Sequence, residues 1–228
     1  MNNIPIITLD GPSGSGKGAV GRMLAKQLGW HFLDSGALYR VVALAAMQAS
    51  ITPTDEIALC ALASSLTVVF GDDGRILLRA GTETSPYDDV SEIIRTDACS
   101  QMASEIAQLP NLRLALLARQ RAFATPAGLV ADGRDMGTVV FPEAAFKFFL
   151  EASPALRAER RYWQLKETGQ NVSLEDLQRQ MVLRDARDRA RADAPLKPAE
   201  DAVVIDTTAL GVKAVCAQIM QMINLPLC

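Results

Sequence analysis

The sequence predicts an α/β fold in which a parallel β-sheet is flanked by helices. A short, nearly continuous apolar run over residues 4–9 is typical of a strand that is buried on both faces. A glycine-rich turn at residues 10–18 and apolar residues at helical spacing over residues 20–28 follow it, and strand–turn–helix is how a parallel sheet begins. Right-handed crossovers would add further strands to the same sheet. Their candidate runs are Leu129–Ala131, Phe146–Leu150, Ala202–Ile205 and, more briefly, Trp30–Leu33.

Two segments depart from this alternation. Residues 67–70 and 76–79 flank the turn residues 71–74, which predicts a β-hairpin that stands on the sheet as a small insert. Residues 155–191 predict two helices, joined through residues 168–171 and dense in arginine.

The composition bounds the class of protein. The chain has 228 residues, a formal net charge of −3 and 49% hydrophobic residues, which suits one α/β domain with insertions and excludes global disorder. Mild acidity argues against a protein that coats nucleic acid through bulk charge. The cysteines are far apart, so neither a zinc site nor a disulfide framework is expected. They are Cys60, Cys99, Cys216 and Cys228. With no signal-type segment and no apolar run long enough for a membrane, we expect the protein in the reducing cytoplasm. We also expect a monomer.

Gly11, Gly16 and Lys17 have the spacing G-x-x-x-x-G-K of a phosphate-binding loop, between a buried strand and a helix. Glycines let backbone N–H groups approach phosphate oxygens, and the positive end of the helix dipole faces the anion. Lys17 would reach the β- and γ-phosphates of ATP. The alternative is a tight turn that binds nothing. The predicted ATP contacts in this loop are Gly11, Pro12, Ser13, Gly14, Ser15, Gly16, Lys17, Gly18 and Ala19.

The residues after the lysine are unusual for such a loop. Gly18 and Ala19 stand where a serine or threonine hydroxyl commonly binds Mg²⁺. Magnesium would then be held mainly by the nucleotide's phosphates and by water, with no direct protein ligand. Asp132, which ends the apolar run 129–131, is the candidate for the outer shell of the ion, and Asp34 is a weaker one. Asp132 could instead be an ordinary residue of a turn at the end of a strand.

Arginines supply the second half of the pattern. Transfer of a phosphoryl group onto a phosphate needs positioned positive charge and no general base, because the acceptor oxygen is already ionised near neutral pH. His31, the sole histidine, is therefore interpreted as a packing residue. Arg184, Asp188 and Arg191 share one helical face. The remaining candidates are Arg40, Arg134 and Arg187, with Arg157, Arg160 and Arg161 on the preceding predicted helix. The alternative is a solvated helix with surface ion pairs; beside a phosphate loop, a lid that excludes water is favoured.

Four motifs resemble those of the bacterial cytidylate kinase family, and the similarity runs from the first strand almost to the C-terminus. They are GPSGSGKG at 11–18, LDSGALYR at 33–40, DGRDMGTVVFP at 132–142 and RDxRDxxR at 184–191. Residues 89–95 are also similar to the segment after that family's insert. The DGRDMGT block is much more specific than the glycine loop.

The resemblance implies a P-loop NTPase-type fold with a five-stranded parallel core, a CMP-binding insert that contains a small antiparallel sheet, and a short helical lid. It also implies ATP-dependent, Mg²⁺-assisted phosphorylation of CMP and dCMP, giving CDP or dCDP and ADP. The expected organisation is one kinase domain over 1–228, with a core of 1–60, 106–153 and 192–228, an insert of 61–105 and a lid of 154–191.

By the same resemblance, individual positions acquire roles. The acceptor's phosphate and ribose would be handled by Ser35, Arg40, Arg134, Arg184, Asp188 and Arg191. The base would be read by Ser104, Arg113 and Asp135, and Arg160 and Arg161 would close over ATP. The catalytic set would be Lys17, Arg184, Asp132 and Arg160. Cytosine offers one amino donor beside two acceptors, which fits acceptors at Asp135 and Ser104 and a donor at Arg113; uracil reverses two of these groups, so CMP should be preferred to UMP. Ala19 departs from the family's usual threonine.

Two rival classes of protein fit the sequence less well. A nucleotide-switch protein would carry serine or threonine after Lys17 and a guanine-reading Asn-Lys-x-Asp segment, and the sequence has neither. A kinase for a small acceptor such as shikimate would not need the insert around residues 67–105 or the residues that read the base.

Overall fold

A five-stranded parallel sheet of order β2-β6-β1-β7-β8 confirms the predicted fold class. Strand β1 pairs in parallel with β6 and β7, and β7 pairs in parallel with β8. Each predicted strand is present, with bounds shifted by one or two residues. The strands are β1 Ile6–Asp10, β2 His31–Asp34, β6 Leu129–Gly133, β7 Phe146–Glu151 and β8 Val203–Asp206.

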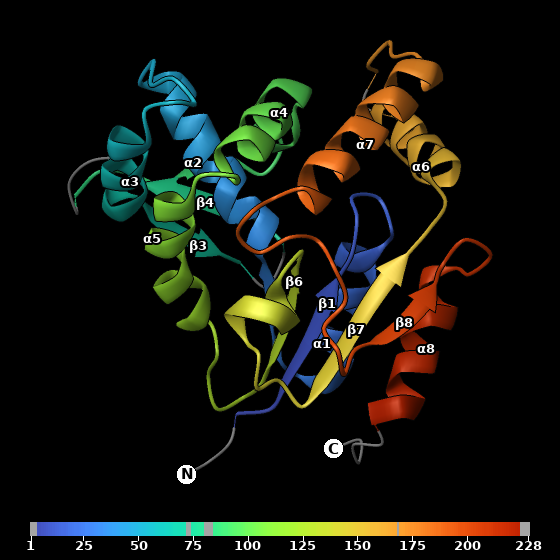
Figure 1. Ribbon diagram of the computed structural model, residues 1–228. Coiled ribbons are helices and arrows are strands. Elements are labelled where there is room, and N and C mark those ends of the chain that lie inside the picture. The colour runs from blue at the N-terminus through green and yellow to red at the C-terminus, as the bar shows by residue number, and fades with distance from the viewer. Residues whose placement is uncertain (1–3, 72–73, 80–83, 168, 224–228) are drawn as a thin grey trace. The chain divides into compact units, whose positions relative to one another are not determined.

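The computed structural model describes residues 4–71, 74–79, 84–167 and 169–223 (Figure 1). By its contacts the chain divides into two compact units. Unit 1 comprises residues 1–32 and 124–228, and unit 2 comprises residues 33–123. Unit 2 includes the predicted insert 61–105 and extends beyond it on both sides.

In unit 1, helices α1 (Lys17–Leu28) and α8 (Val212–Ile223) cover one face of the sheet. Ile7 and Leu9 of β1 are fully buried in that apolar layer. Because side chains alternate along a strand, Thr8 and Asp10 face the other side. There a one-turn π-helix, Met136–Val140, packs against β1. A π-helix was not predicted.

Helices α6 (Pro154–Glu167) and α7 (Leu174–Arg189) form a hairpin in unit 1, as predicted. The two helices share a small core of their own. Ser173 caps α7, because its Oγ accepts a hydrogen bond from the N–H of Asp176 at 3.3 Å. Helix α7 ends at Arg189, so Arg191 follows the helix and does not lie inside it as predicted.

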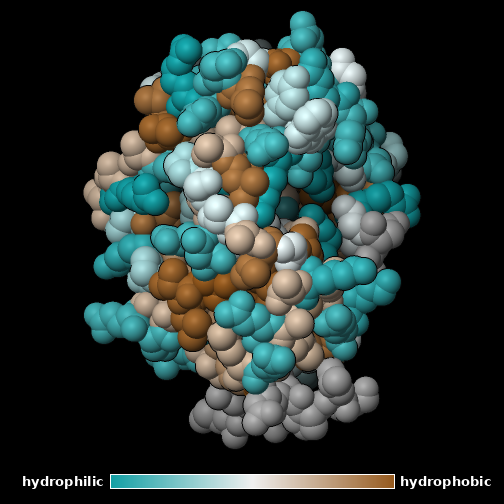
Figure 2. Space-filling model, turned by 90° about the vertical axis from the view of Figure 1, so that its right-hand side faces the viewer, coloured by the Kyte–Doolittle hydropathy of each residue, from teal (hydrophilic) through white to brown (hydrophobic). Residues whose placement is uncertain are grey.

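Strand β8 forms one edge of the sheet. Val203 and Val204 are 43% and 52% exposed on it, and apolar residues are visible among hydrophilic ones on this side of the molecule (Figure 2). The strand is only four residues long, and a short edge limits pairing with another chain.

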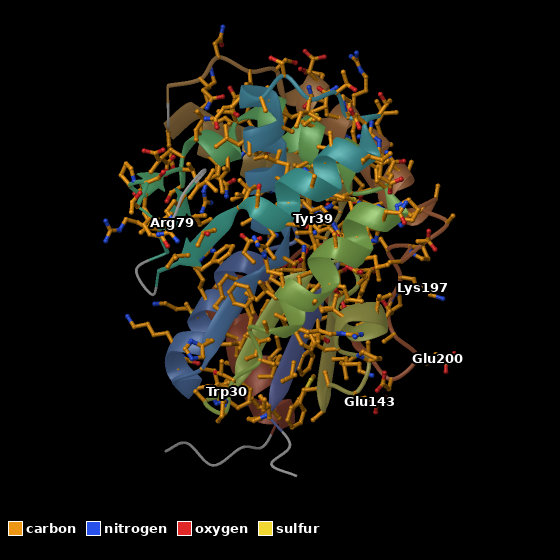
Figure 3. All side chains as sticks on the ribbon, turned by 90° about the vertical axis from the view of Figure 1, so that its left-hand side faces the viewer. Trp30, Tyr39, Arg79, Glu143, Lys197 and Glu200 are labelled. Carbon is orange, nitrogen blue, oxygen red and sulfur yellow. The ribbon has the colours of Figure 1, made fainter. Side chains whose placement is uncertain are left out.

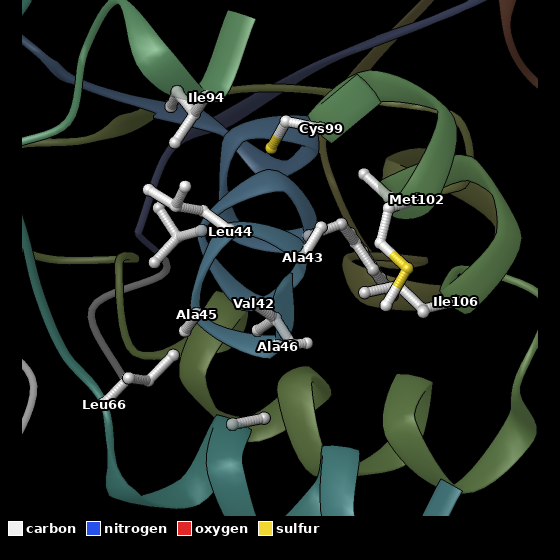
Figure 4. Close-up of a cluster of buried hydrophobic side chains, with 14 of the residues drawn as sticks. Val42, Ala43, Leu44, Ala45, Ala46, Leu66, Ile94, Cys99, Met102 and Ile106 are labelled. Carbon is white, nitrogen blue, oxygen red and sulfur yellow. The ribbon is translucent and has the colours of Figure 1, made fainter. Parts of the chain in front are cut away.

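In unit 2, helix α2 (Ser35–Gln48) runs through the centre of an apolar core (Figure 4). Its small residues Ala43 and Ala46 are fully buried and allow the neighbouring helices to approach closely. Cys99, Met102 and Ile106 pack on it from α4. The other helices are α3 Glu56–Ser65, the 3₁₀ turn Ile93–Arg95, α4 Asp97–Ile106 and α5 Pro110–Arg121.

The predicted hairpin is part of a three-stranded antiparallel sheet in unit 2. Strand β3 (Thr67–Phe70) pairs with β4 (Ile76–Arg79), and β4 pairs with β5 (Asp88–Asp89), a strand that was not predicted. Two residues of the predicted turn, Asp72 and Asp73, lie outside the described residues.

The start of β2 corrects the interpretation of His31. Its side chain is exposed, while its backbone N–H donates to the Gly128 carbonyl at 3.1 Å. The packing role belongs instead to Trp30 (Figure 3), because a Cβ on Gly128 would lie 2.5 Å from the indole. His31 is thus an exposed residue at the start of β2, which is an edge strand of the sheet.

Candidate active site

The backbone of the glycine loop is shaped for close approach. Gly11, Gly14 and Gly16 have φ values of 142°, 78° and 95°, which side chains rarely adopt. At Gly11 a Cβ would lie 2.1 Å from the carbonyl oxygen of Leu150 in β7, so only glycine fits. Helix α1 begins immediately after the loop, at Lys17. The positive end of its dipole therefore favours an anion at the loop.

Lys17 lies back against the loop. Its side chain is nearly buried, and Nζ donates to the Pro12 carbonyl at 2.8 Å and to Ser15 Oγ at 3.4 Å. Nζ also lies 4.0 Å from Asp132 Oδ1. The ammonium group is thus already among the loop's backbone groups, where a phosphate would meet it.

Asp132 lies within β6 and not after it, because the strand continues to Gly133. The turn-residue alternative is therefore wrong. The carboxylate is buried, and its Oδ2 lies 3.3 Å from where a Cβ of Gly18 would be, next to the start of α1.

A magnesium ion fits this arrangement. Kinase sites commonly hold Mg²⁺ through one or two carboxylates, substrate phosphates and water. Asp132 offers a carboxylate near Lys17, whereas Gly18 and Ala19 offer no side-chain oxygen. No group of three or more His, Cys, Asp or Glu side chains within the described ranges is placed to hold a metal ion. The donor set suits an ion that arrives with the nucleotide.

Two groups from the C-terminal half of the chain support the loop. Arg160 donates to the Gly14 carbonyl at 3.3 Å and to the Thr207 carbonyl at 3.0 Å. The Thr207 hydroxyl is buried and lies 2.9 Å from the Ser15 carbonyl and 2.8 Å from the Glu151 carbonyl. Arg160 therefore lies beside the loop. Arg161 is partly exposed on α6, and its contact with ATP stays a prediction.

Asp188 joins two of the predicted arginines. Its carboxylate accepts from Arg134 Nε at 3.1 Å and from the guanidinium of Arg191. Asp188 is 1% exposed, and the Arg191 side chain is also nearly buried. A buried carboxylate between two guanidiniums holds both in fixed positions.

The charged side chains of this cluster shift one another's pKa. Burial raises the pKa of Asp188, but the charges of Arg134, Arg191 and Arg184 lower it more, so the net pKa lies below its usual value. Burial lowers the pKa of Arg134, and Asp188 and Asp132 raise it by more. Arg134, Arg184, Asp188 and Arg191 thus come together in unit 1.

Asp10 is a further buried carboxylate, at the end of β1. It accepts hydrogen bonds from the N–H groups of Met136 and Gly137, both at 2.8 Å. Burial raises its pKa to about 7 against the effect of these two bonds, and the charge of Asp135 raises it further while that of Lys17 lowers it. Asp10 therefore fastens the π-helix, and with it the segment of Arg134 and Asp135, to the strand before the glycine loop.

The predicted residues of unit 2 form a second group. Ser35 begins α2, and Ser104 is buried in α4. Arg113 donates to the Ala107 carbonyl at 3.0 Å, and its guanidinium lies 5.8 Å from the ring centroid of Tyr39 (Figure 3). These contacts orient Arg113 within unit 2.

Asp34 precedes α2, the central helix of unit 2, and Arg40 lies in the second turn of that helix. The carbonyl of Arg40, in α2, accepts from the thiol of Cys99 at 3.2 Å. Asp34 caps α2, since its Oδ1 accepts from the Ala37 N–H at 3.0 Å. The structure gives Asp34 a capping role, and an outer-shell role at magnesium stays a prediction.

Comparison with known proteins settles the family. A family model described as "Cytidylate kinase" matches residues 7–225. The chain belongs to the cytidylate kinase family. Curated cytidylate kinases of Methylococcus capsulatus and Pseudomonas fluorescens are 52% and 53% identical to it over 227 and 226 residues, which is 97% and 96% of this chain and 99% and 96% of theirs. A crystal structure of an uncharacterized protein from Eubacterium ventriosum has a TM-score of 0.51 at 12% identity, covering 97% of this chain and 99% of that one, and shows a likeness of fold.

The predicted family and enzyme class are therefore confirmed: this cytidylate kinase is a phosphotransferase. The nucleotide-switch and shikimate-type readings are set aside. Among the described residues of this cytidylate kinase, no helix is both long and apolar enough to cross a membrane. Cys60, Cys99 and Cys216 are free thiols, as expected, while Cys228 lies outside the described residues.

Sequence reasoning missed several groups that organise the site of this cytidylate kinase. Asp10 and Thr207 were not singled out, although each stands where a parallel strand ends, an edge at which such sheets bind ligands. Arg157 was assigned to the lid, but the structure buries it against Asp185. Only the three-dimensional contacts distinguish this arginine from its neighbours.

Proposed function

We propose that this cytidylate kinase transfers the γ-phosphoryl group of ATP to CMP and dCMP, with the donor on the glycine loop and the acceptor phosphate on the arginine cluster of unit 1. One observation carries the proposal. Asp132 lies 4.0 Å from Lys17 and acts electrostatically on Arg134, so a donor-side cation and an acceptor-side cation share one carboxylate. Positive groups on both sides of one carboxylate suit a reaction in which the donor and acceptor phosphates must lie close together.

On the donor side, the loop N–H groups and Lys17 would bind the β- and γ-phosphates, with Arg160 beside them. Mg²⁺, when it arrives with ATP, would neutralise part of the phosphate charge, and Asp132 would hold its water shell. The loop carbonyls of Ser15 and Gly14 accept hydrogen bonds from Thr207 and Arg160, respectively. The loop then needs little rearrangement when the anion binds.

On the acceptor side, Arg134, Arg184 and Arg191 would hold the phosphate of CMP. An ionised phosphate oxygen attacks without a general base, so the work of these groups is to orient the acceptor and stabilise the spreading negative charge. Asp188 holds two of the guanidiniums in place and would accept a hydrogen bond from the ribose. We propose that Ser35 and Arg40 also bind the phosphate or ribose of the acceptor.

The base would be recognised by hydrogen bonds that uracil cannot match. Ser104 and Asp135 would accept from the cytosine amine, and Arg113 would donate to its acceptors. With uracil, a buried acceptor of the protein would face a carbonyl and be left unpaired, which commonly costs about 1–3 kcal/mol. We therefore expect CMP and dCMP to be preferred over UMP.

A coupled assay of ADP release tests the proposal, with CMP, dCMP, UMP, AMP and shikimate as acceptors. We expect turnover with CMP and dCMP, weaker turnover with UMP and none with shikimate. Absence of turnover with every nucleotide would overturn the proposal. Preference for shikimate would replace it with the small-acceptor reading.

A matched pair of variants on α7 tests the arginine cluster. Arg184→Ala should lower kcat by about 10²–10³-fold while leaving the unfolding temperature nearly unchanged. Arg189→Ala, in which an exposed arginine of the same helix is removed, should leave kcat unchanged. Equal activities of the two variants would remove Arg184 from the proposed set. A monomeric state and a cytoplasmic location belong to the proposal as well, and size-exclusion chromatography and cell fractionation test them.

A further inference from the structure

Arg157 is a charged side chain buried at the base of the α6–α7 hairpin. It is 1% exposed. Its Nε donates to the Ala152 carbonyl at 3.0 Å, and one terminal nitrogen donates to the Ser13 carbonyl at 2.9 Å. The same nitrogen lies 3.1 Å from Asp185 Oδ1, and the other terminal nitrogen bonds Asp185 Oδ2. One guanidinium thus joins the end of β7, the glycine loop, α6 and α7.

Arg157 packs closely against the glycine loop. A Cβ placed on Gly14 would lie 3.1 Å from Cβ of Arg157 and 3.4 Å from its carbonyl oxygen. Together with the hydrogen bond to Ser13, this leaves little room for the loop to shift relative to α6. Gly14 is therefore glycine for packing as well as for its positive φ.

The contact with α7 lies next to the arginine cluster. Asp185 adjoins Arg184 in the chain and lies one helical turn before Asp188, which holds Arg134 and Arg191. Because a helix turn is rigid, a displacement of Asp185 carries the cluster with it. The pair thereby connects the loop that would hold ATP to the cations that would hold the acceptor phosphate.

We infer that the Arg157–Asp185 pair is a positioning device, which fixes the acceptor-side arginines relative to the donor-side glycine loop. This inference rests on the proposed function. It also revises the predicted lid of residues 154–191, because the base of that hairpin is anchored to the core and only its far end is left to move. Neither residue contacts a reacting atom in this reading.

A buried ion pair is suited to this role for a physical reason. Apolar side chains of similar volume often replace such a pair with no loss of stability, so attraction alone does not explain its presence. A planar guanidinium bound at both oxygens of one carboxylate, and also to a backbone carbonyl, instead fixes an orientation. Orientation matters for phosphoryl transfer, in which misplacement by about 1 Å can cost about 10²-fold in rate.

The decisive experiment replaces the pair by apolar residues. The double variant Arg157→Met, Asp185→Leu should unfold cooperatively close to the wild-type temperature, lose about 10²-fold in kcat, and show KM values for ATP and CMP within about threefold of wild type. The matched control is Asp176→Leu, Arg179→Met, which removes an ion pair on the same hairpin with a separation of 3.3 Å and side chains that are 59% and 71% exposed. The control should retain wild-type kcat and KM.

A conservative variant keeps the inference testable if the double variant does not fold. Arg157→Lys keeps the charge but cannot bind Asp185 at both oxygens and Ser13 together. We expect a folded protein whose kcat lies between the wild type and the double variant. Wild-type kcat in a folded double variant would overturn the inference, as would a rise in the KM for ATP alone with unchanged kcat.

Failure of the proposed function would be recognised separately. If the wild type phosphorylated no nucleotide, the proposed function would fall, and hydrogen exchange would still test the inference. Amides of residues 11–16 and 184–191 should then exchange faster in the double variant than in the wild type, and the control pair should not change them. Unchanged exchange in both segments would refute the positioning role.

Discussion

Replacing Asp10 by asparagine would test how the strand before the glycine loop holds the π-helix. The carboxyl is 4% exposed and accepts two backbone N–H groups, of Met136 and Gly137. Burial nevertheless raises its pKa from 3.8 to about 7. The folded chain therefore retains a proton on this group at pH values where the unfolded chain has released it.

The sign and size of the effect follow from linkage. A carboxyl whose pKa is raised on folding leaves stability intact below the unfolded pKa and removes it progressively as pH rises to the folded pKa. The shift of Asp10 from 3.8 to about 7 corresponds to about 4 kcal/mol at about 1.4 kcal/mol per unit. More than a third of this loss is complete by pH 5, so about 2–3 kcal/mol should be lost between pH 5 and pH 8.

Asparagine cannot ionise, so Asp10→Asn removes this pH dependence. The amide accepts only one of the two N–H groups, which should cost about 1–3 kcal/mol at every pH. The free energy of unfolding of the variant should thus rise by about 2–3 kcal/mol relative to wild type when the pH is changed from 5 to 8. The diagnostic quantity is this change, not the absolute stability.

Urea unfolding followed by fluorescence of the two tryptophans provides the assay. Asp206→Asn is the matched control, because Asp206 also ends a parallel strand, is exposed, and has a pKa lowered by its hydrogen bonds to Thr208. A group with a lowered pKa loses stability only in acid, so the control should follow wild type between pH 5 and pH 8. The same pH dependence in Asp10→Asn and wild type would refute the reasoning.

Three further predictions follow from local geometry. Gly137→Ala would place a Cβ 2.9 Å from Thr8 Oγ1 and should destabilise the fold by about 1–3 kcal/mol, whereas adding Thr8→Ala should restore most of the melting temperature; a double variant no more stable than the single one would contradict this. Ala19→Thr adds the hydroxyl that the loop lacks and should lower the KM for MgATP about two- to tenfold, measured by titrating Mg²⁺ in the kinase assay, with an unchanged KM as the adverse result. Arg113→Met should raise the KM for CMP at least tenfold and leave the KM for ATP unchanged; parallel increases in both would exclude a role at the base.

Features whose causes are local in the chain could be predicted from the sequence. The strand β1, the glycine loop and α1 are contiguous, and each has its own signal: an apolar run, the G-x-x-x-x-G-K spacing and helical periodicity. The α6–α7 hairpin was predictable for the same reason. The errors lie at element ends, as with Asp132 inside β6 and Arg191 beyond α7, where tertiary contacts decide the boundary.

Features that depend on distant partners could not be predicted. The π-helix at residues 136–140 is held by Asp10, which is more than a hundred residues earlier in the chain. Nothing in the local sequence MGTVV indicates π-helical bonding. The exposure of His31 is similar, because burial at the edge of a sheet is decided by what covers that edge and not by the apolar residues beside it in sequence.

Asp185 and Asp188 of α7 show how far charge patterning can lead an interpretation. In the run RDARDRAR both aspartates alternate with arginines in the same way, so the sequence does not distinguish them. In the structure Asp188 lies between Arg134 and Arg191, while Asp185 faces Arg157. The two aspartates are three residues apart and lie on adjoining parts of one helical face. Even so, Asp185 bonds one guanidinium and Asp188 bonds two others.

Asp188 and Asp185 should therefore contribute to different properties of the protein. Since Asp188 has a lowered pKa, the charges of its cluster should persist into acid, and their contribution to stability is lost only as pH falls through that lowered value. Asp185, by contrast, contacts a guanidinium that also bonds the glycine loop. Its contribution is therefore to the position of α7 relative to that loop. Under the proposed function, acid should weaken the arginine cluster only as pH falls through the lowered pKa of Asp188. Substitution of the Arg157–Asp185 pair should instead lower kcat.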